Sequence, residues 1–67
     1  MHKKRISVND KEFVFETDNL TISALLEKLK IQAEGIAVCV NGDIIRKKNF
    51  SEYVLNEGDK VDIITMV

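Results

Sequence analysis

The sequence predicts a small α+β domain in which one helix covers one face of a β-sheet, with the elements in the order β-β-α-β-β-β. Two turn signals and one helical stripe carry this prediction. Asn9-Asp10 and Asn41-Gly42 each separate two short apolar runs, as in β-hairpins. The stretch between the two hairpins contains one segment of helical periodicity. A length of 67 residues allows one domain, so we expect residues 1–67 to fold as a single unit.

The first half of the chain predicts a hairpin followed by a helix. Residues 5–8 and 12–16 alternate between apolar and polar side chains with a period of two, as strands do. Thr21 then stands in the N-cap position of a helix. The apolar stripe of this helix recurs at i, i+3, i+4 and i+7 and consists of Ile22, Leu25, Leu26 and Leu29. Lys28 and Lys30 are expected in its last turn, where positive charge suits the helix dipole.

The second half predicts three more strands. Gly35 ends the helical pattern, residues 36–40 form an apolar strand, and residues 43–46 continue beyond Asn41-Gly42 as its partner. Residues 50–55 are expected to form a loop with one helical turn. Residues 56–59 form a turn, and the last segment, 58–67, is a final strand that runs to the carboxyl terminus.

A sheet with one helix leaves its other face uncovered, and the strand residues divide accordingly. The helix side is expected to take Ile6, Val8, Phe13, Phe15, Ile36, Val38, Val40, Val61 and Ile63. The opposite register contains Ser7, Val14, Ala37, Cys39, Asp62, Ile64 and Met66. Several of these are apolar, so we predict a protein-docking surface at Ala37, Cys39, Asp62, Ile64 and Met66. The alternative is that they are singly exposed apolar residues of the kind common on small proteins.

Composition excludes several function classes. Ten Lys and Arg against eleven Asp and Glu give a net charge of −1, which argues against nucleic-acid binding driven by bulk charge. No apolar run approaches the roughly 18 residues of a membrane span, and no apolar segment follows the basic start as in a secretory signal. One cysteine allows no internal disulfide, which favours a reducing compartment. We expect a cytoplasmic protein with no nucleic-acid or membrane partner.

Four segments, in order and with matching spacing, resemble ThiS, the sulfur carrier family of thiamin biosynthesis. They are residues 6–9, 21–26, 35–45 and 57–64, which together cover essentially the whole chain. The resemblance implies a ubiquitin-like β-grasp fold, with a mixed sheet of four to five strands and one main helix. It also implies a protein co-substrate and not an enzyme. The related carrier of molybdopterin synthesis is the nearest competing family.

The family resemblance implies a chemistry at the chain end. The terminal Gly-Gly carboxylate is adenylated by a ThiF-type activating enzyme, which uses ATP. The activated carboxyl then becomes a thiocarboxylate, whose sulfur thiazole synthase builds into the thiazole ring. No bound cofactor or metal is expected on the carrier itself. To reach an enclosed ATP site, such a tail must lie extended in a narrow tunnel. Glycine allows this at the lowest steric cost because it has no side chain.

The sequence departs from this pattern at its end, Thr65-Met66-Val67, because the expected Gly-Gly would lie just beyond Val67. A β-branched valine would crowd the reacting carboxyl. Three interpretations stay open: a shortened form, a tail completed by a separate event, or a fold that has lost the chemistry. In the last case the chain is a ubiquitin-like binding module that carries nothing. The sequence does not fix the oligomeric state.

Other reactive residues have simpler explanations. Cys39 lies in the middle of a predicted strand without an activating neighbour, and we interpret it as a small residue of the sheet. His2 stands alone near the terminus, and no His/Cys spacing suggests zinc. The basic clusters at residues 3–5 and 46–48 lack the exposed aromatics of an RNA site, so we interpret them as solvated strand ends and a loop. A thiol-dependent enzyme is the most distant alternative, because no catalytic cluster accompanies Cys39.

Overall fold

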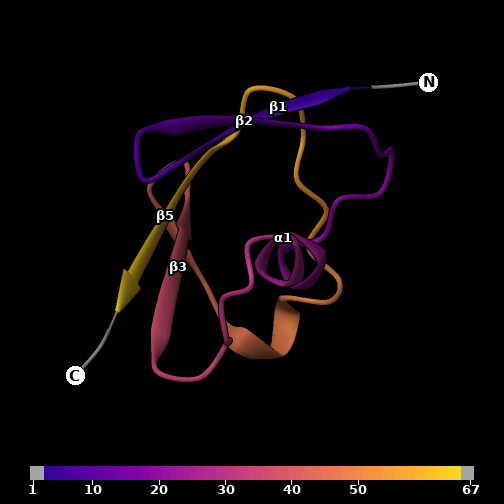
Figure 1. Ribbon diagram of the computed structural model, residues 1–67. Helices are drawn as coiled ribbons and strands as arrows, with labels where there is room; N and C mark the ends of the chain where they lie inside the picture. The colour runs from indigo at the N-terminus through magenta and orange to yellow at the C-terminus, as the bar shows by residue number, and fades with distance from the viewer. Residues whose placement is uncertain (1–2, 66–67) are drawn as a thin grey trace.

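The structure, a computed structural model that describes residues 3–65, consists of one five-stranded sheet with the helix α1 on one side (Figure 1). The strand order is β2-β1-β5-β3-β4. The elements are β1 (Lys4–Val8), β2 (Lys11–Phe15), α1 (Ile22–Lys28), β3 (Ile36–Val40), β4 (Asp43–Ile45) and β5 (Lys60–Thr65). The predicted order of elements, with one helix packed on one face of the sheet, is confirmed.

Both predicted hairpins form at their predicted turns. Strands β1 and β2 are antiparallel, and so are β3 and β4. Asn9 and Asp10 adopt φ values of 49° and 69°, and Asn41 and Gly42 adopt 51° and 90°. Two successive residues with positive φ match the right-handed twist of the flanking strands, which is why Asn, Asp and Gly suit these turns.

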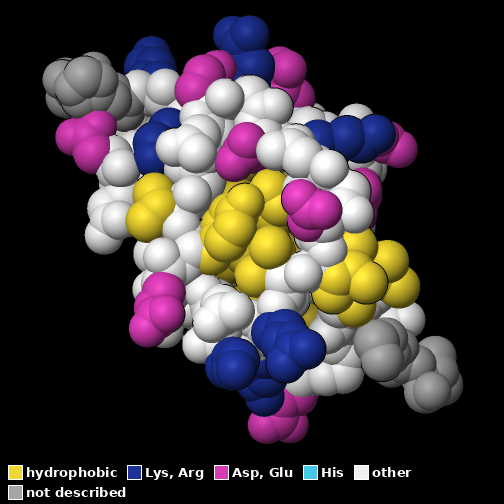
Figure 2. Space-filling model, turned by 180° about the vertical axis from the view of Figure 1, so that it is seen from behind, with side chains coloured by type: hydrophobic (Ala, Val, Ile, Leu, Met, Phe, Trp, Pro, Cys, Tyr) yellow, Lys and Arg dark blue, Asp and Glu magenta, His cyan; other side chains and the backbone are white. Residues whose placement is uncertain are grey.

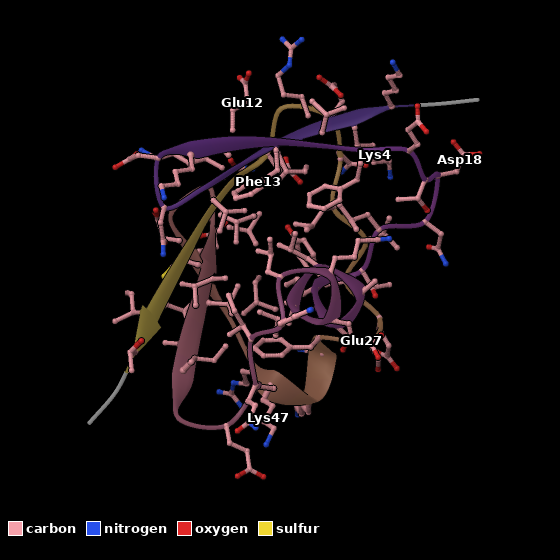
Figure 3. The ribbon with its side chains drawn as sticks, in the orientation of Figure 1. Lys4, Glu12, Phe13, Asp18, Glu27 and Lys47 are labelled. Atoms are coloured by element: carbon pink, nitrogen blue, oxygen red, sulfur yellow. The ribbon has the colours of Figure 1, made fainter. Side chains whose placement is uncertain are left out.

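The side chains of β2 show the period of two directly. In Figure 3, Phe13 points toward α1 and Glu12 points away from it. The helix-side set predicted from the sequence is confirmed in the same way. Its members Ile6, Val38 and Val61 are fully buried, and the remaining ones are buried or partly buried against the same core.

Strand β5, the last in the sequence, occupies the centre of the sheet. It pairs in parallel with β1 at Ser7↔Lys60 and Val8↔Val61. On its other side it pairs antiparallel with β3, from Val40↔Val61 to Ile36↔Thr65. The predicted strand 58–67 therefore begins too early, because Gly58, at a φ of 85°, still belongs to the preceding turn. Residues 66–67 lie outside the described part of the chain.

Asn9 extends the contact between β1 and β5 beyond the regular ladder. Its N–H donates to the Val61 carbonyl at 3.0 Å, and its side-chain Oδ1 accepts a hydrogen bond from the Ile63 N–H at 2.7 Å. The side chain thus takes the place of a backbone carbonyl at the point where the chain turns away toward β2. Asn9 therefore extends the hydrogen bonding of β5 on this side from Val61 to Ile63.

Helix α1 begins as predicted and ends earlier than predicted. The Thr21 hydroxyl accepts a hydrogen bond from the Ala24 N–H at 3.1 Å, the expected N-cap contact. Lys28 lies in the last turn, as expected. Lys30 does not, because its φ of 58° is a left-handed conformation that ends the helix.

The segment 50–55 contributes more to the core than the sequence predicted. A short 3-10 helix occupies Lys47–Asn49, just before this segment, and the Tyr53 N–H donates to the Asn49 carbonyl at 2.9 Å, so a helical turn continues into it. Phe50 and Leu55 are buried and were not among the predicted core residues, nor was Leu20. The Leu55 N–H donates to the Leu20 carbonyl at 2.7 Å, so this segment runs along the start of α1.

The role of Asn9 in fixing β5 predicts a selective effect of substitution. Asn9→Gly keeps the left-handed turn but removes the acceptor, so the Ile63 amide should exchange with solvent at least about tenfold faster, while global stability falls by about 1 kcal/mol. Asn9→Asp keeps the acceptor and should retain slow exchange. Hydrogen exchange by NMR and urea unfolding measure both effects. Unchanged exchange at Ile63 in Asn9→Gly would show that the side chain is not what holds this strand.

Candidate functional site

The uncovered face of the sheet carries the residues predicted to dock a partner. Because Val38, Val40 and Val61 are buried on the helix side, their strand neighbours must face the other way. The register places Cys39 opposite Asp62 and Ala37 opposite Ile64. Four of the five predicted residues therefore share this face. The fifth, Met66, lies outside the described residues.

Ile44 belongs to the same face and was missed from the sequence. It lies on β4, pairs with Cys39 and is 74% exposed. The signal was present, because the Asn41-Gly42 turn sets Asp43 opposite Val40 and hence Ile44 opposite Cys39. We call Ala37, Cys39, Ile44 and Ile64 the apolar patch.

The apolar patch spans three neighbouring strands, β4, β3 and β5. Ala37 and Cys39 are half-buried, whereas Ile64 is 51% exposed. Figure 2, seen from behind, shows hydrophobic side chains gathered at the surface, with charged side chains around them. A contiguous exposed apolar group of this kind favours contact with another protein more than isolated apolar residues do.

Charged residues flank the apolar patch on two sides. Asp62 lies on β5 opposite Cys39. Arg46, Lys47 and Lys48 follow directly after β4, and no described carboxylate lies within 4.0 Å of their charged atoms. Figure 3 shows Lys47 at the lower end of the molecule. A partner with both signs of charge around an apolar centre would complement this arrangement.

Val14 is also exposed on this face but does not belong to the apolar patch. It lies on the edge strand β2 and is 54% exposed. Its partner across the pairing is Arg5 of β1, and β1 lies between β2 and β5. Val14 is therefore an isolated exposed apolar residue, as the alternative interpretation of this face expected.

The basic cluster at residues 3–5 is only partly a solvated strand end. Lys3 and Arg5 lie near carboxylates, at 3.9 Å from Glu16 and 3.7 Å from Glu12. Lys4 differs from the prediction, because its ammonium donates to the Asp18 carbonyl at 2.9 Å and to the Leu55 carbonyl at 2.8 Å. It joins β1 to the loops before α1 and before β5, and so has a structural role.

Residues 3–65 contain no group of three or more His, Cys, Asp or Glu side chains that could hold a metal, and they form no pocket. Cys39 is a free, half-buried thiol. No helix in this part of the chain is long and apolar enough to cross a membrane. The features that the described structure offers for function are thus the apolar patch and the end of β5.

Known proteins resemble this chain in both fold and sequence. The crystal structure of the thiamine biosynthesis protein ThiS from Geobacter metallireducens matches with a TM-score of 0.85 and 28% identity, over 94% of each chain. The mixed sheet with its single helix is thus the ubiquitin-like β-grasp fold that the sequence led us to expect. Among curated proteins, a thiazole synthase from Paramagnetospirillum magneticum is 29% identical over 63 residues.

The two similarities differ in how much of the other protein they cover. The matched residues are 94% of this chain but 19% of the thiazole synthase, so the chain spans about a fifth of that relative. The model of the ThiS family matches residues 3–67. This match covers nearly the whole sequence, and the chain therefore belongs to the ThiS family.

Proposed function

We propose that this protein is a sulfur carrier of thiamin biosynthesis that serves formation of the thiazole ring as a protein co-substrate and not as an enzyme. The observation that carries the proposal is the match of the ThiS family over residues 3–67, together with a shared fold at a TM-score of 0.85. The family match favours the thiamin pathway over the related molybdopterin carrier.

The chemistry proposed for the chain end needs an enzyme and ATP. A carboxylate is a poor electrophile, so a ThiF-type activating enzyme joins it to AMP, and pyrophosphate leaves. Sulfide, as HS⁻, then attacks the acyl carbon and displaces AMP, and loss of the thiol proton leaves a thiocarboxylate. In this chain the reacting carboxyl would be that of Val67 or of residues added after it, beyond the end of β5.

Thiazole synthase is the proposed acceptor of the sulfur. The curated relative supports this, because a protein named thiazole synthase contains a segment similar to nearly all of this chain within a polypeptide about five times as long. A carrier joined covalently to the enzyme it serves is always close to it, since a tether raises the effective concentration. In this chain the two would meet as separate molecules or as parts of one longer chain.

The apolar patch is the proposed contact with the activating enzyme. Its exposed members, Ile44 and Ile64, lie on strands on either side of Cys39 and Ala37. Large apolar side chains at the centre of a protein contact usually contribute most of its affinity. Asp62 and the basic residues 46–48 would form the charged border and increase the rate of encounter.

The proposed contact predicts different effects for two equally exposed side chains. Ile64→Asp should weaken binding of the activating enzyme at least about tenfold, because it places a charge where an apolar contact forms. Val14→Asp, at 54% exposure against 51% for Ile64, should bind like the wild type. Titration calorimetry measures both affinities, and both variants should unfold within about 1 kcal/mol of the wild type.

Two results would contradict this contact. If Ile64→Asp unfolds the protein while Val14→Asp does not, Ile64 belongs to the core. If both variants bind with wild-type affinity, the activating enzyme does not use the apolar patch.

Intact mass spectrometry tests the carrier function itself. The chain and a version extended by Gly-Gly are each incubated with the host's activating enzyme, ATP and a sulfur donor. The extended version should gain the mass of a thiocarboxylate, in which one oxygen is replaced by sulfur. If neither version gains sulfur while the enzyme still binds them, the chain is a binding module without carrier chemistry.

A further inference from the structure

Strand β5 is central in the sheet, yet part of one of its edges has no partner. On the β3 side the pairing continues to Ile36↔Thr65. On the β1 side the ladder ends at Val8↔Val61, and Asn9 adds one side-chain contact at Ile63. In Figure 1, β5 continues toward the C-terminus below the β1–β2 hairpin, with β3 alone beside it.

The hydrogen bonds show which backbone groups point to this free edge. The Asp59 and Val61 carbonyls accept from Ser7 and Asn9 of the first hairpin, and the Ile63 N–H donates to Asn9 Oδ1. Odd-numbered residues of β5 thus direct their backbone groups toward β1, because these groups alternate along a strand. The Ile63 carbonyl and the Thr65 N–H point the same way, and none of residues 3–65 forms a hydrogen bond with either. We call these two groups the free edge.

We infer that an extended segment of the activating enzyme pairs with the free edge and so adds a strand beside the end of β5. This inference rests on the function proposed above. The Ile63 carbonyl and the Thr65 N–H belong to residues two apart, the spacing at which one residue of a parallel strand bonds both. Backbone pairing of this kind is a general mode of binding an extended segment.

The free edge is too short to hold a partner alone. Two backbone hydrogen bonds contribute little against the cost of association, so a second copy of this chain would not be held there. Ile64, between the two edge residues, is itself a member of the apolar patch. An enzyme already bound to the apolar patch therefore lies beside the free edge. There, two further backbone hydrogen bonds suffice to order its extended segment.

Asn9 sets where this added strand begins. Because its side-chain Oδ1 already accepts the hydrogen bond of the Ile63 N–H, the first backbone group without a partner along this edge is the Ile63 carbonyl. Pairing from that group onward would hold the backbone straight through residue 65. An extended backbone is the form in which a terminal carboxyl can reach an enclosed ATP site.

A proline at residue 65 tests the inference, because proline has no N–H to donate. Thr65→Pro removes a donor that forms no bond within the described fold, and proline is tolerated where the N–H of a strand points outward. In the Gly-Gly-extended protein, this variant should bind the activating enzyme about tenfold more weakly than the wild type. The matched control Thr65→Val keeps the N–H and should bind like the wild type.

A second variant distinguishes the effect of losing the N–H donor from the effect of any backbone bend that the proline ring causes. An ester in place of the amide between residues 64 and 65, introduced by chemical synthesis, removes the same N–H without a ring. It should weaken binding like Thr65→Pro. Circular dichroism and urea unfolding check that each variant is folded, and the ester variant decides the result if the proline variant is not.

The outcomes distinguish this inference from the proposed function. Weaker binding by the ester variant, with Thr65→Val unaffected, supports strand pairing at the free edge. Wild-type binding by the ester variant overturns it and leaves the carrier function intact. If the extended wild-type protein neither binds the enzyme nor gains sulfur, the proposed function fails and this inference fails with it.

Discussion

The pairing of β5 with both β1 and β3 is the constraint on which the rest of this structure depends. The strand that comes last in the sequence lies in the middle of the sheet, so neither hairpin can join the other without it. Its parallel contact with β1 brings together segments more than fifty residues apart, such as Asn9 and Ile63. Such long-range pairing costs loop-closure entropy before it stabilises the fold. The buried Val61, which pairs with Val8 on one side and Val40 on the other, compensates by joining the core of both halves.

This central position gives β5 three roles at once. Val61 is in the core and Ile63 packs against it, while Asp62 and Ile64 face outward, where Ile64 is part of the apolar patch. At Thr65, its last residue, β5 is accompanied by β3 alone among the described strands. The proposed carrier function needs a stable body, a surface that an enzyme recognises and a chain end that the enzyme can reach. One strand of six residues would contribute to all three.

Much of the fold was predictable because its signals are local. Asn9-Asp10 and Asn41-Gly42 specify turns, Thr21 specifies a helix start, and alternation specifies faces. The parts that were missed depend on contacts between distant segments. Leu20 and Leu55 are buried because two loops pair with each other, and Lys4 is bound by carbonyls from two loops. The residues of the uncovered face followed from the period of two, but Ile44 required the hairpin register, and the free edge required knowing where β1 ends.

Hydrogen exchange along β5, in the free protein and in complex with the activating enzyme, tests most directly the claim that this strand connects the fold to its function. In the free protein, the Val61 and Ile63 amides should exchange slowly and the Thr65 amide rapidly, since only the first two have partners on the β1 side. In the complex, the Thr65 amide should become protected. An amide at Thr65 that is already protected in the free protein, or that stays unprotected in the complex, would contradict the account.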